Sequence, residues 1–325
     1  MKEIIVNNNQ ENKRLDSFLK SYLKEATGSF IYKMLRKKNI TLNDKKADGK
    51  EKLKVGDSIK IYFSDETLDK FIGHNTSTAK TARKYEFDDL SVDVIYEDDD
   101  IVLVSKPVGL LSQKSKPDDV SLNDWLIHYL LNRGVVTEES LLSYKPSICN
   151  RLDRNTSGLV ICAKSLTGAR VMNKMLQDRT LDKYYRTIVQ GHLDKGIRLK
   201  GFLYKDEVKN KVYIKDSDPG DERYSYVETE YVPLEYYKDK DLTLLEVKLI
   251  TGKPHQIRAH LSSIGHPLIG DVKYGGKKYK RLNYQLLHNY RLEFPKEMKD
   301  GCEQLSGKVF VAGEPLIFKG ILRKG

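Results

Sequence analysis

A carboxylate with a guanidinium on either side is the feature of this sequence that most suggests chemistry. In the segment SICNRLDRNTSGLVICAKS, Asp153 lies between Arg151 and Arg154, ahead of a short polar loop and the apolar run Leu159–Ala163. A nearby positive charge favours the ionised form of a carboxylate. Such an anion can act as a nucleophile, as a base or as a stabiliser of developing positive charge. The residues alone leave a second interpretation open, in which these side chains form a structural ion pair.

Few other residues have the types and spacing that catalysis requires. The further candidates are Tyr184, Tyr185 and Arg258, the last in HQIRAH. His255 and His260 are five residues apart, which places them on different sides of a helix, whereas helical metal ligands are usually four apart. The acidic run Glu97–Asp100 fits a turn between strands better than a metal site. With no G-x-S-x-G elbow, no dinucleotide or phosphate loop and no obvious Cys–His pair, the sequence predicts no metal and no cofactor.

The elements that position these residues are predicted to be strands with a few helices between them. Helices are expected at 122–130, 166–178 and about 255–264. Strands are expected in VDVIYEDDDIVLVSK, KYYRTIVQG, RYSYVETEYVPLEYY, LTLLEVKLI and LLHNYRLEF. Because strands outnumber helices and follow one another in runs, we predict an α+β fold with a mixed, largely antiparallel sheet.

A small α+β module is expected at residues 1–63. One predicted helix buries a face formed by Leu15, Phe18, Leu19, Tyr22 and Leu23, and Gly28 ends it. Ser29 is then expected to cap a second helix from Phe30 to about Lys38. Short strands are expected near residues 40–42 and 59–63.

The charge of the chain is concentrated in this module. Residues 1–63 hold 15 Lys and Arg against 8 Asp and Glu, a net +7 of the total +11. Such an imbalance favours contact with a polyanion such as a nucleic acid. The expected contact surface is the basic side of the second helix, which carries Lys33, Arg36, Lys37 and Lys38. The alternative is a solvated face with no partner.

Residues 64–90 are polar and without periodicity, so we predict a linker followed by a larger domain at 91–325. No apolar run approaches the ~18 residues of a membrane span, and the N-terminus lacks the apolar segment of a secretory signal. The three cysteines, Cys149, Cys162 and Cys302, are too widely spaced for a disulfide framework or a zinc site. We therefore expect a protein of the reducing cytoplasm.

Four segments resemble the RluA-type pseudouridine synthases. NRLDRNTSGLVICAKS resembles their H-R-L-D-x-x-T-S-G-L signature, KYYRTIVQG their K-x-Y-x-A-x-V-x-G strand, and TGKPHQIRAHLSSIGHPLIGD their T-G-R-T-H-Q-I-R-x-H-L segment. YEDDDIVLVSKPVGL is similar to the opening of their catalytic domain. The first 63 residues resemble the S4 RNA-binding domain found in the RluC/RluD-like branch. The resemblance covers most of the chain and implies an S4-like domain at 1–63 and a pseudouridine synthase catalytic domain at 91–325.

The resemblance also implies roles for individual residues. Asp153 matches the catalytic aspartate of the family, and Tyr185 matches the aromatic residue that stacks on the target uracil. Arg258 matches the basic residue that pairs with the aspartate, and Ile257 lines the base pocket. Arg151 matches a residue that helps to extrude the uridine. The family aspartate either attacks C1′ or removes a proton from C2′, and both routes remain open here.

The sequence departs from the family pattern at a few positions. Asn150 replaces the usual His, and Asn can still form hydrogen bonds but does not titrate. Lys253–Pro254 replaces Arg-Thr, and Thr187 replaces Ala.

The implied function is isomerisation of uridine to pseudouridine in RNA, without metal or cofactor. The expected substrate is large-subunit (23S) ribosomal RNA, with transfer RNA as the alternative. No membrane and no obligate protein partner are expected, and the chain should be a monomer. Two other readings remain: a non-catalytic RNA-binding or ribosome-assembly protein on the same scaffold, and a glycosidase-like hydrolase, which would need a second catalytic carboxylate.

Overall fold

The computed structural model describes residues 1–73, 87 and 90–323, which form two compact units. The first comprises residues 1–90, 125–147 and 164–167, and the second comprises 91–124, 148–163 and 168–325. Most of the expected linker, residues 74–86 and 88–89, lies outside the described residues. The second unit is not continuous in sequence, in contrast to the uninterrupted domain expected at 91–325.

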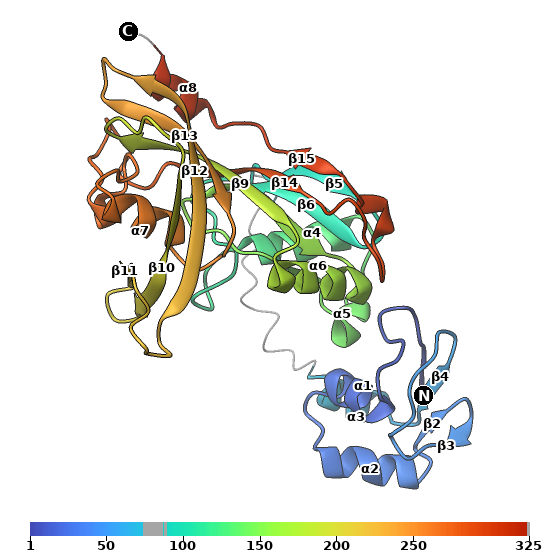
Figure 1. The fold of residues 1–325 in the computed structure, drawn as a ribbon. Helices are drawn as coiled ribbons and strands as arrows, with labels where there is room; N and C mark the ends of the chain where they lie inside the picture. The colour runs from blue at the N-terminus through green and yellow to red at the C-terminus, as the bar shows by residue number, and fades with distance from the viewer. Residues whose placement is uncertain (74–86, 88–89, 324–325) are drawn as a thin grey trace. The chain divides into compact units, whose positions relative to one another are not determined.

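The N-terminal part of the first unit is a small sheet with two helices (Figure 1). Its strands run in the order β1-β4-β2-β3 and are antiparallel; they are β1 (Lys2–Ile5), β2 (Ile40–Leu42), β3 (Lys45–Lys46) and β4 (Ser58–Ile61). Helices α1 (Leu15–Tyr22) and α2 (Gly28–Arg36) bury their apolar faces in one core with these strands. The expected cap at Ser29 is wrong by two residues, because Thr27 accepts the Phe30 N–H and α2 begins at Gly28.

Part of the predicted linker is a helix. Residues Asp65–Ile72 form α3, capped by Ser64, and Leu68 and Ile72 are buried in the same core as α1 and α2. The small module therefore extends past residue 63. The first unit also holds most of α4 (Leu122–Asn132) and all of α5 (Ser140–Ser143).

The second unit is built on one large mixed sheet (Figure 1). Its strands follow the order β11-β10-β12-β13-β9-β14-β8-β6-β5, with β15 paired to β14 and β7 to β8. The bounds are β5 (Asp93–Glu97), β6 (Ile101–Lys106), β7 (Ser147–Ile148), β8 (Ser157–Ala163), β9 (Asp182–Gln190), β10 (Ile197–Asp206), β11 (Lys211–Lys215), β12 (Ser225–Tyr237), β13 (Leu242–Leu249), β14 (Leu287–Glu293) and β15 (Val309–Val311). Along the main path every described pair is antiparallel except β14–β8. The predicted α+β class with a largely antiparallel sheet is confirmed.

The second unit also holds most of helix α6 (Leu166–Asp178), which follows β8, and all of α7 (Gln256–Ser263) and α8 (Leu316–Leu322), which follow β13 and β15. Val171, Met172 and Met175 of α6 pack against buried residues of β6 and β8. Ala259 of α7 and Tyr274 of the 3₁₀ turn η3 (Val272–Tyr274) pack against β10, β11 and β12. A second 3₁₀ turn, η4, spans Glu303–Leu305. The predicted helices at 166–178 and near 255–264 are confirmed.

The parallel junction between β14 and β8 fixes the loop that carries Asp153. All seven residues of β8 are buried, as expected of a strand with covered faces. Asn289 of β14 pairs both with Gly158 at the start of β8 and with Tyr185 of β9. The loop that carries Asp153, just before β8, is thereby held close to Tyr185 of β9. No helix among the described residues is long and apolar enough to cross a membrane.

Candidate active site

Asp153 lies in the loop between β7 and β8, and a buried serine ties that loop down. The Leu152 N–H donates to Ser112 Oγ over 2.9 Å, and Ser112 Oγ–H donates to the Leu152 carbonyl over 2.7 Å. The Thr156 N–H donates to the Asp153 carbonyl over 3.0 Å. The main chain on both sides of Asp153 is thus fixed, while its side chain keeps about a third of its surface exposed.

A fully buried lysine, Lys106, also anchors the main chain of this loop. Lys106, at the end of β6, donates from Nζ to the carbonyls of Pro107, Leu110 and Arg154 over 2.8, 2.8 and 3.1 Å. Burial lowers the pKa of Lys106 to about 7, against the opposing charge of Asp153. Three carbonyl acceptors match the three donors of an ammonium group, so this side chain links two turns of the chain next to the carboxylate.

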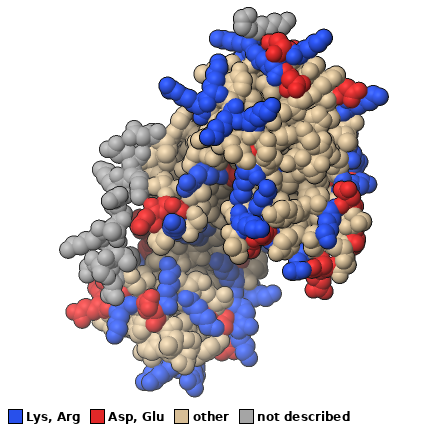
Figure 2. All heavy atoms as spheres, turned by 90° about the vertical axis from the view of Figure 1, so that its left-hand side faces the viewer, with Lys and Arg blue, Asp and Glu red and all other residues tan. Residues whose placement is uncertain are grey.

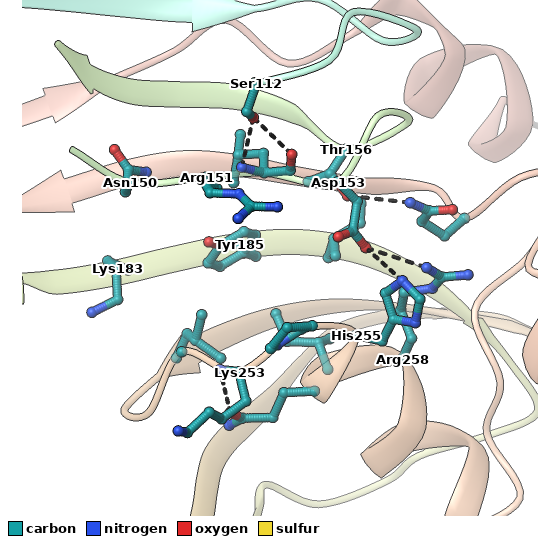
Figure 3. Close-up of a pocket in the computed structure, with 18 of the residues that line it drawn as sticks. Ser112, Asn150, Arg151, Asp153, Thr156, Lys183, Tyr185, Lys253, His255 and Arg258 are labelled. Atoms are coloured by element: carbon teal, nitrogen blue, oxygen red, sulfur yellow. Dashed lines mark hydrogen bonds and ion pairs between the residues drawn. The ribbon is translucent and has the colours of Figure 1, made fainter. Parts of the chain in front are cut away.

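Arg258 of α7 is the main partner of Asp153 (Figure 3). Its Nη1 lies 3.2 Å from Asp153 Oδ2, while Nε and Nη2 donate to the two oxygens of Asp271 over 2.7 and 2.8 Å. Burial opposes the charged form, but Asp271 and Asp153 outweigh it and raise the pKa of Arg258. The buried Asp271 carboxylate fixes the guanidinium in a two-bond fork through Nε and Nη2, which leaves Nη1 free to donate to Asp153.

Two apolar groups face the same cavity. Tyr185 of β9 is 5% exposed, and burial, with the charge of Asp153 as a second cause, raises the pKa of its hydroxyl. The group is therefore a neutral phenol at physiological pH. Ile257, beside Arg258 on α7, is also buried and lines the cavity. Figure 3 shows Arg151, Tyr185 and Asp153 on one side of the cavity, with His255 and Arg258 opposite Asp153.

The cavity has a volume of about 860 Å³ and a strongly cationic wall. Of the described residues that line it, one is acidic, Asp153, and eight are Lys or Arg: Arg151, Arg154, Arg179, Lys183, Lys205, Lys253, Arg258 and Lys273. Lys and Arg side chains also gather on the face drawn in Figure 2. A wall of this composition suits a polyanionic ligand, with a single carboxylate placed among its charges.

The structure gathers five of the predicted site residues and leaves four elsewhere. Asp153, Arg151, Tyr185, Ile257 and Arg258 line the one cavity. Lys33, Arg36, Lys37 and Lys38 are exposed at the end of α2 in the other unit. Among the described residues, Asp153 forms its ion pair with Arg258 of α7 rather than with the flanking arginines, and the ring of His255 lies close to the same carboxylate.

Asn150, which stands where the family has His, forms side-chain hydrogen bonds to the main chain of β8. Its Oδ1 accepts the Ile161 N–H over 2.8 Å, and its Nδ2 donates to the Leu159 carbonyl over 3.4 Å. Both partners are main-chain groups of β8. The amide therefore ties the loop to the strand, a task that requires no titration.

Four functional neighbours were missed by the sequence reasoning: Lys106, Ser112, His255 and Asp271. His255 was considered only as a helical metal ligand, but it precedes α7 in a left-handed conformation (φ 52°) and points at Asp153. Asp271, which is buried, ends the segment GHPLIGD. That segment resembles the family pattern, and this resemblance was the signal that could have identified Asp271. For Lys106 and Ser112 the sequence carries no signal of their shared loop.

The cavity at the centre of the large sheet, with one acidic and eight basic residues among the described ones that line it, is suited to a polyanionic substrate such as a nucleic acid. The comparisons give the family: residues 100–263 match the model described as RNA pseudouridylate synthase. An RNA pseudouridine synthase of Mycoplasma genitalium is 30% identical over 302 residues, 90% of this chain and 89% of its own length. A ribosomal large subunit pseudouridine synthase C of Rickettsia prowazekii is 31% identical over 286 residues, 85% of this chain and 86% of its own.

The fold agrees with that of solved relatives. Human RNA pseudouridylate synthase domain containing 4 superposes with a TM-score of 0.57 at 19% identity, covering 70% of this chain and 90% of that one. The chain belongs to the RNA pseudouridylate synthase family and is an isomerase that acts on RNA. The predicted RluA-type membership is confirmed, and the S4 assignment of the N-terminal module stays a prediction.

Proposed function

We propose that this protein converts specific uridines of large-subunit ribosomal RNA to pseudouridine, with Asp153 as the catalytic residue. The observation that carries the proposal is the Asp153 carboxylate, which alone among the described lining residues is acidic in a cationic cavity and is paired with a guanidinium that Asp271 holds in place. The choice of RNA rests on relatives whose names specify the ribosomal large subunit.

The target uridine must leave its stack to reach Asp153. Flipping a nucleotide costs a few kcal/mol, and stacking on an aromatic side chain recovers roughly 1–3 kcal/mol per base. Tyr185, buried in the cavity wall next to Asp153, is the ring available for this contact. Arg151, exposed at the cavity, helps to hold the extruded nucleotide, and Ile257 closes the apolar side of the base site.

The reaction rearranges atoms without any net exchange. The C1′–N1 bond breaks, the uracil turns, and C5 bonds to C1′ while the proton on C5 is lost and N1 is protonated. Asp153 serves either by attacking C1′ or by removing a proton from C2′. Both routes need an ionised, oriented carboxylate. Arg258 holds the Asp153 carboxylate in that state and orientation through a charge-assisted hydrogen bond. Both also need exclusion of water, since water would trap the separated base or sugar.

The basic helix α2 supplies affinity in this proposal. Lys33, Arg36, Lys37 and Lys38 are exposed and carry no acidic neighbour on α2. Contacts of this kind go to phosphates and add binding energy that is largely independent of sequence. The module acts as an S4-like RNA-binding domain, and selection of the uridine belongs to the cavity.

The test is a pseudouridine map of ribosomal and transfer RNA from cells with and without the gene, restored by the wild-type chain. Loss of one or a few pseudouridines in large-subunit ribosomal RNA is the expected result. Loss confined to transfer RNA would overturn the choice of substrate. Product analysis with purified protein separates the alternatives, because a non-catalytic RNA-binding protein leaves the RNA unchanged and a hydrolase releases free base.

A further inference from the structure

His255 is a second polar group aimed at the carboxylate of Asp153. It lies just before α7, and its left-handed backbone (φ 52°, ψ 13°) turns the ring into the cavity. Its side chain is 12% exposed, and Nε2 lies 3.7 Å from Asp153 Oδ2, the oxygen that Arg258 also approaches (Figure 3). A left-handed conformation at a non-glycine residue is uncommon and often marks a functional position.

The other ring nitrogen is committed to a buried tyrosine. His255 Nδ1 lies 2.9 Å from Tyr274 Oη, and that hydroxyl already accepts the Val212 N–H over 2.9 Å. Among the described residues, His255 Nδ1 is the atom placed to accept a hydrogen bond from the Tyr274 hydroxyl, which has one proton to donate. If this proton goes to Nδ1, the hydrogen of a neutral imidazole must be on Nε2, facing Asp153.

The surroundings keep the imidazole neutral. Burial is the largest cause and lowers the pKa of His255; Arg258 and Lys273 act in the same direction, whereas Asp153 and Asp271 oppose them. Tyr274, the remaining titratable group in contact with the ring, is itself buried, and burial raises its pKa. A neutral imidazole with Nε2–H is a hydrogen-bond donor that adds no charge next to the carboxylate.

We propose that His255 is a positioning residue for the reaction: as the Nε2–H tautomer fixed by Tyr274, it acts with Arg258 to hold Asp153 Oδ2 and presents Oδ1 to the ribose. The inference rests on the proposed function of Asp153. The 3.7 Å separation exceeds a hydrogen bond by less than 1 Å, and such contacts often tighten when substrate binds. Among the described residues, Oδ1 has no hydrogen-bond partner within the protein.

The experiment compares three variants in single-turnover pseudouridine formation, with KM measured beside kcat. His255→Leu removes the donor and should lower kcat on the order of 10- to 100-fold, the value of one hydrogen bond to a charged group, with KM within about twofold. His255→Gln keeps an N–H near the position of Nε2 and should recover most of that loss. Tyr274→Phe removes the proton that fixes the tautomer and should lower kcat by less than His255→Leu.

A spectroscopic readout tests the tautomer without relying on activity. Nitrogen-15 NMR of labelled wild-type protein, with the His255 signals assigned by their absence in His255→Gln, should show Nε2 protonated and Nδ1 bare. In Tyr274→Phe that preference should weaken. A wild-type protein with the hydrogen on Nδ1 would overturn the proposal, even if His255→Leu failed to fold.

The outcomes also separate this inference from the proposed function. An active Asp153→Asn enzyme would defeat the assignment of Asp153 itself. With Asp153→Asn inactive, a folded His255→Leu variant with wild-type kcat would overturn only the role of His255. Equal loss in His255→Gln and His255→Leu, at equal thermal stability, would show that the Nε2 donor is not what the residue supplies.

Discussion

Tyr185 combines a buried ring with a hydroxyl that stays protonated, so its two halves can be tested apart. Tyr185→Phe keeps the stacking surface and should bind target RNA with a Kd within about twofold of wild type. Tyr185→Leu should lose roughly 1–3 kcal/mol, about 5- to 150-fold, in both Kd and rate. The measurement is Kd on target RNA together with single-turnover rate.

A neighbouring tyrosine provides the control. Tyr184 lies on the opposite side of β9 because side chains alternate along a strand, and its ring stacks with Arg291 outside the cavity lining. Tyr184→Leu should leave Kd unchanged. If Tyr185→Phe and Tyr185→Leu bind equally well, stacking is not the contribution of Tyr185.

Individual site residues could be predicted from the sequence only where they lie within a recognisable local motif. Asp153, Tyr185 and Arg258 lie in distinctive strings and were predicted from them. Their partners Lys106 and Asp271 become neighbours only through folding. A lysine whose donors all go to main-chain carbonyls has no sequence mark that separates it from a solvated one.

Among the elements, strand β8 depends on a glycine near its start. Gly158 has φ +111°, and a Cβ there would lie 2.1 Å from the Asn289 carbonyl oxygen of β14. Gly158→Ala should therefore separate β8 from β14 and cost on the order of 3 kcal/mol or more of unfolding free energy. Denaturant unfolding of the full chain measures this.

The matched control is Gly320→Ala in α8, where an added Cβ meets nothing within 4 Å. Replacing a helical glycine by alanine should stabilise by up to about 1 kcal/mol. Equal stability of Gly158→Ala and wild type would contradict the close approach of the two strands.

Element prediction succeeded where periodicity was long and failed where it was short or interrupted. The strands β12 and β13 have sustained patterns and were predicted within a few residues. In β10 the alternation is broken by Gly201, which is required because a Cβ would lie 2.7 Å from Ile214 Cγ2 of β11. Helix α3 buries only Leu68 and Ile72, too few positions to reveal a period.

For the whole molecule, charge reversal tests the proposal that the basic module contributes RNA affinity while the cavity selects and converts the uridine. Changing Lys33, Arg36, Lys37 and Lys38 to Glu in the full chain should raise KM for structured RNA and change kcat much less, because uniform binding energy affects KM. The log–log salt dependence should flatten by about 0.7 for each lost single-strand phosphate contact. KM and kcat measured against salt give both quantities.

Reversal of four other exposed lysines is the control: Lys238, Lys296, Lys299 and Lys319, which lie outside the cavity lining. This variant has the same net charge as the first. An identical change in salt slope for both would assign the effect to net charge and leave α2 as a solvated face.

Two buried histidines should make the fold sensitive to acid. Burial lowers the pKa values of His260 and His288 to about 4, from 6.5, and the Nε2 atom of each is buried without a hydrogen-bond partner among the described residues. The unfolded chain binds more protons than the folded one below pH 6.5, so stability falls as pH drops toward 4. Between pH 7 and 5 each should cost about 2 kcal/mol of unfolding free energy.

Denaturant unfolding of wild type and His260→Asn at several pH values checks this. The variant should show a shallower loss of stability below pH 6.5, since asparagine does not titrate. His192→Asn, at an exposed position, should keep the wild-type slope. A wild-type free energy of unfolding that is flat from pH 7 to 5 would contradict the neutral, buried state of both rings.

The central claim is that the carboxylate of Asp153 performs the isomerisation. Asp153→Asn is nearly isosteric but uncharged, so RNA binding and thermal stability should stay near wild type. Single-turnover formation of pseudouridine should fall at least 100-fold, a barrier increase of about 3 kcal/mol or more. Asp194→Asn, at an exposed position outside the cavity lining, should react at the wild-type rate. An Asp153→Asn enzyme that binds RNA and retains more than about a hundredth of the wild-type rate would contradict the account.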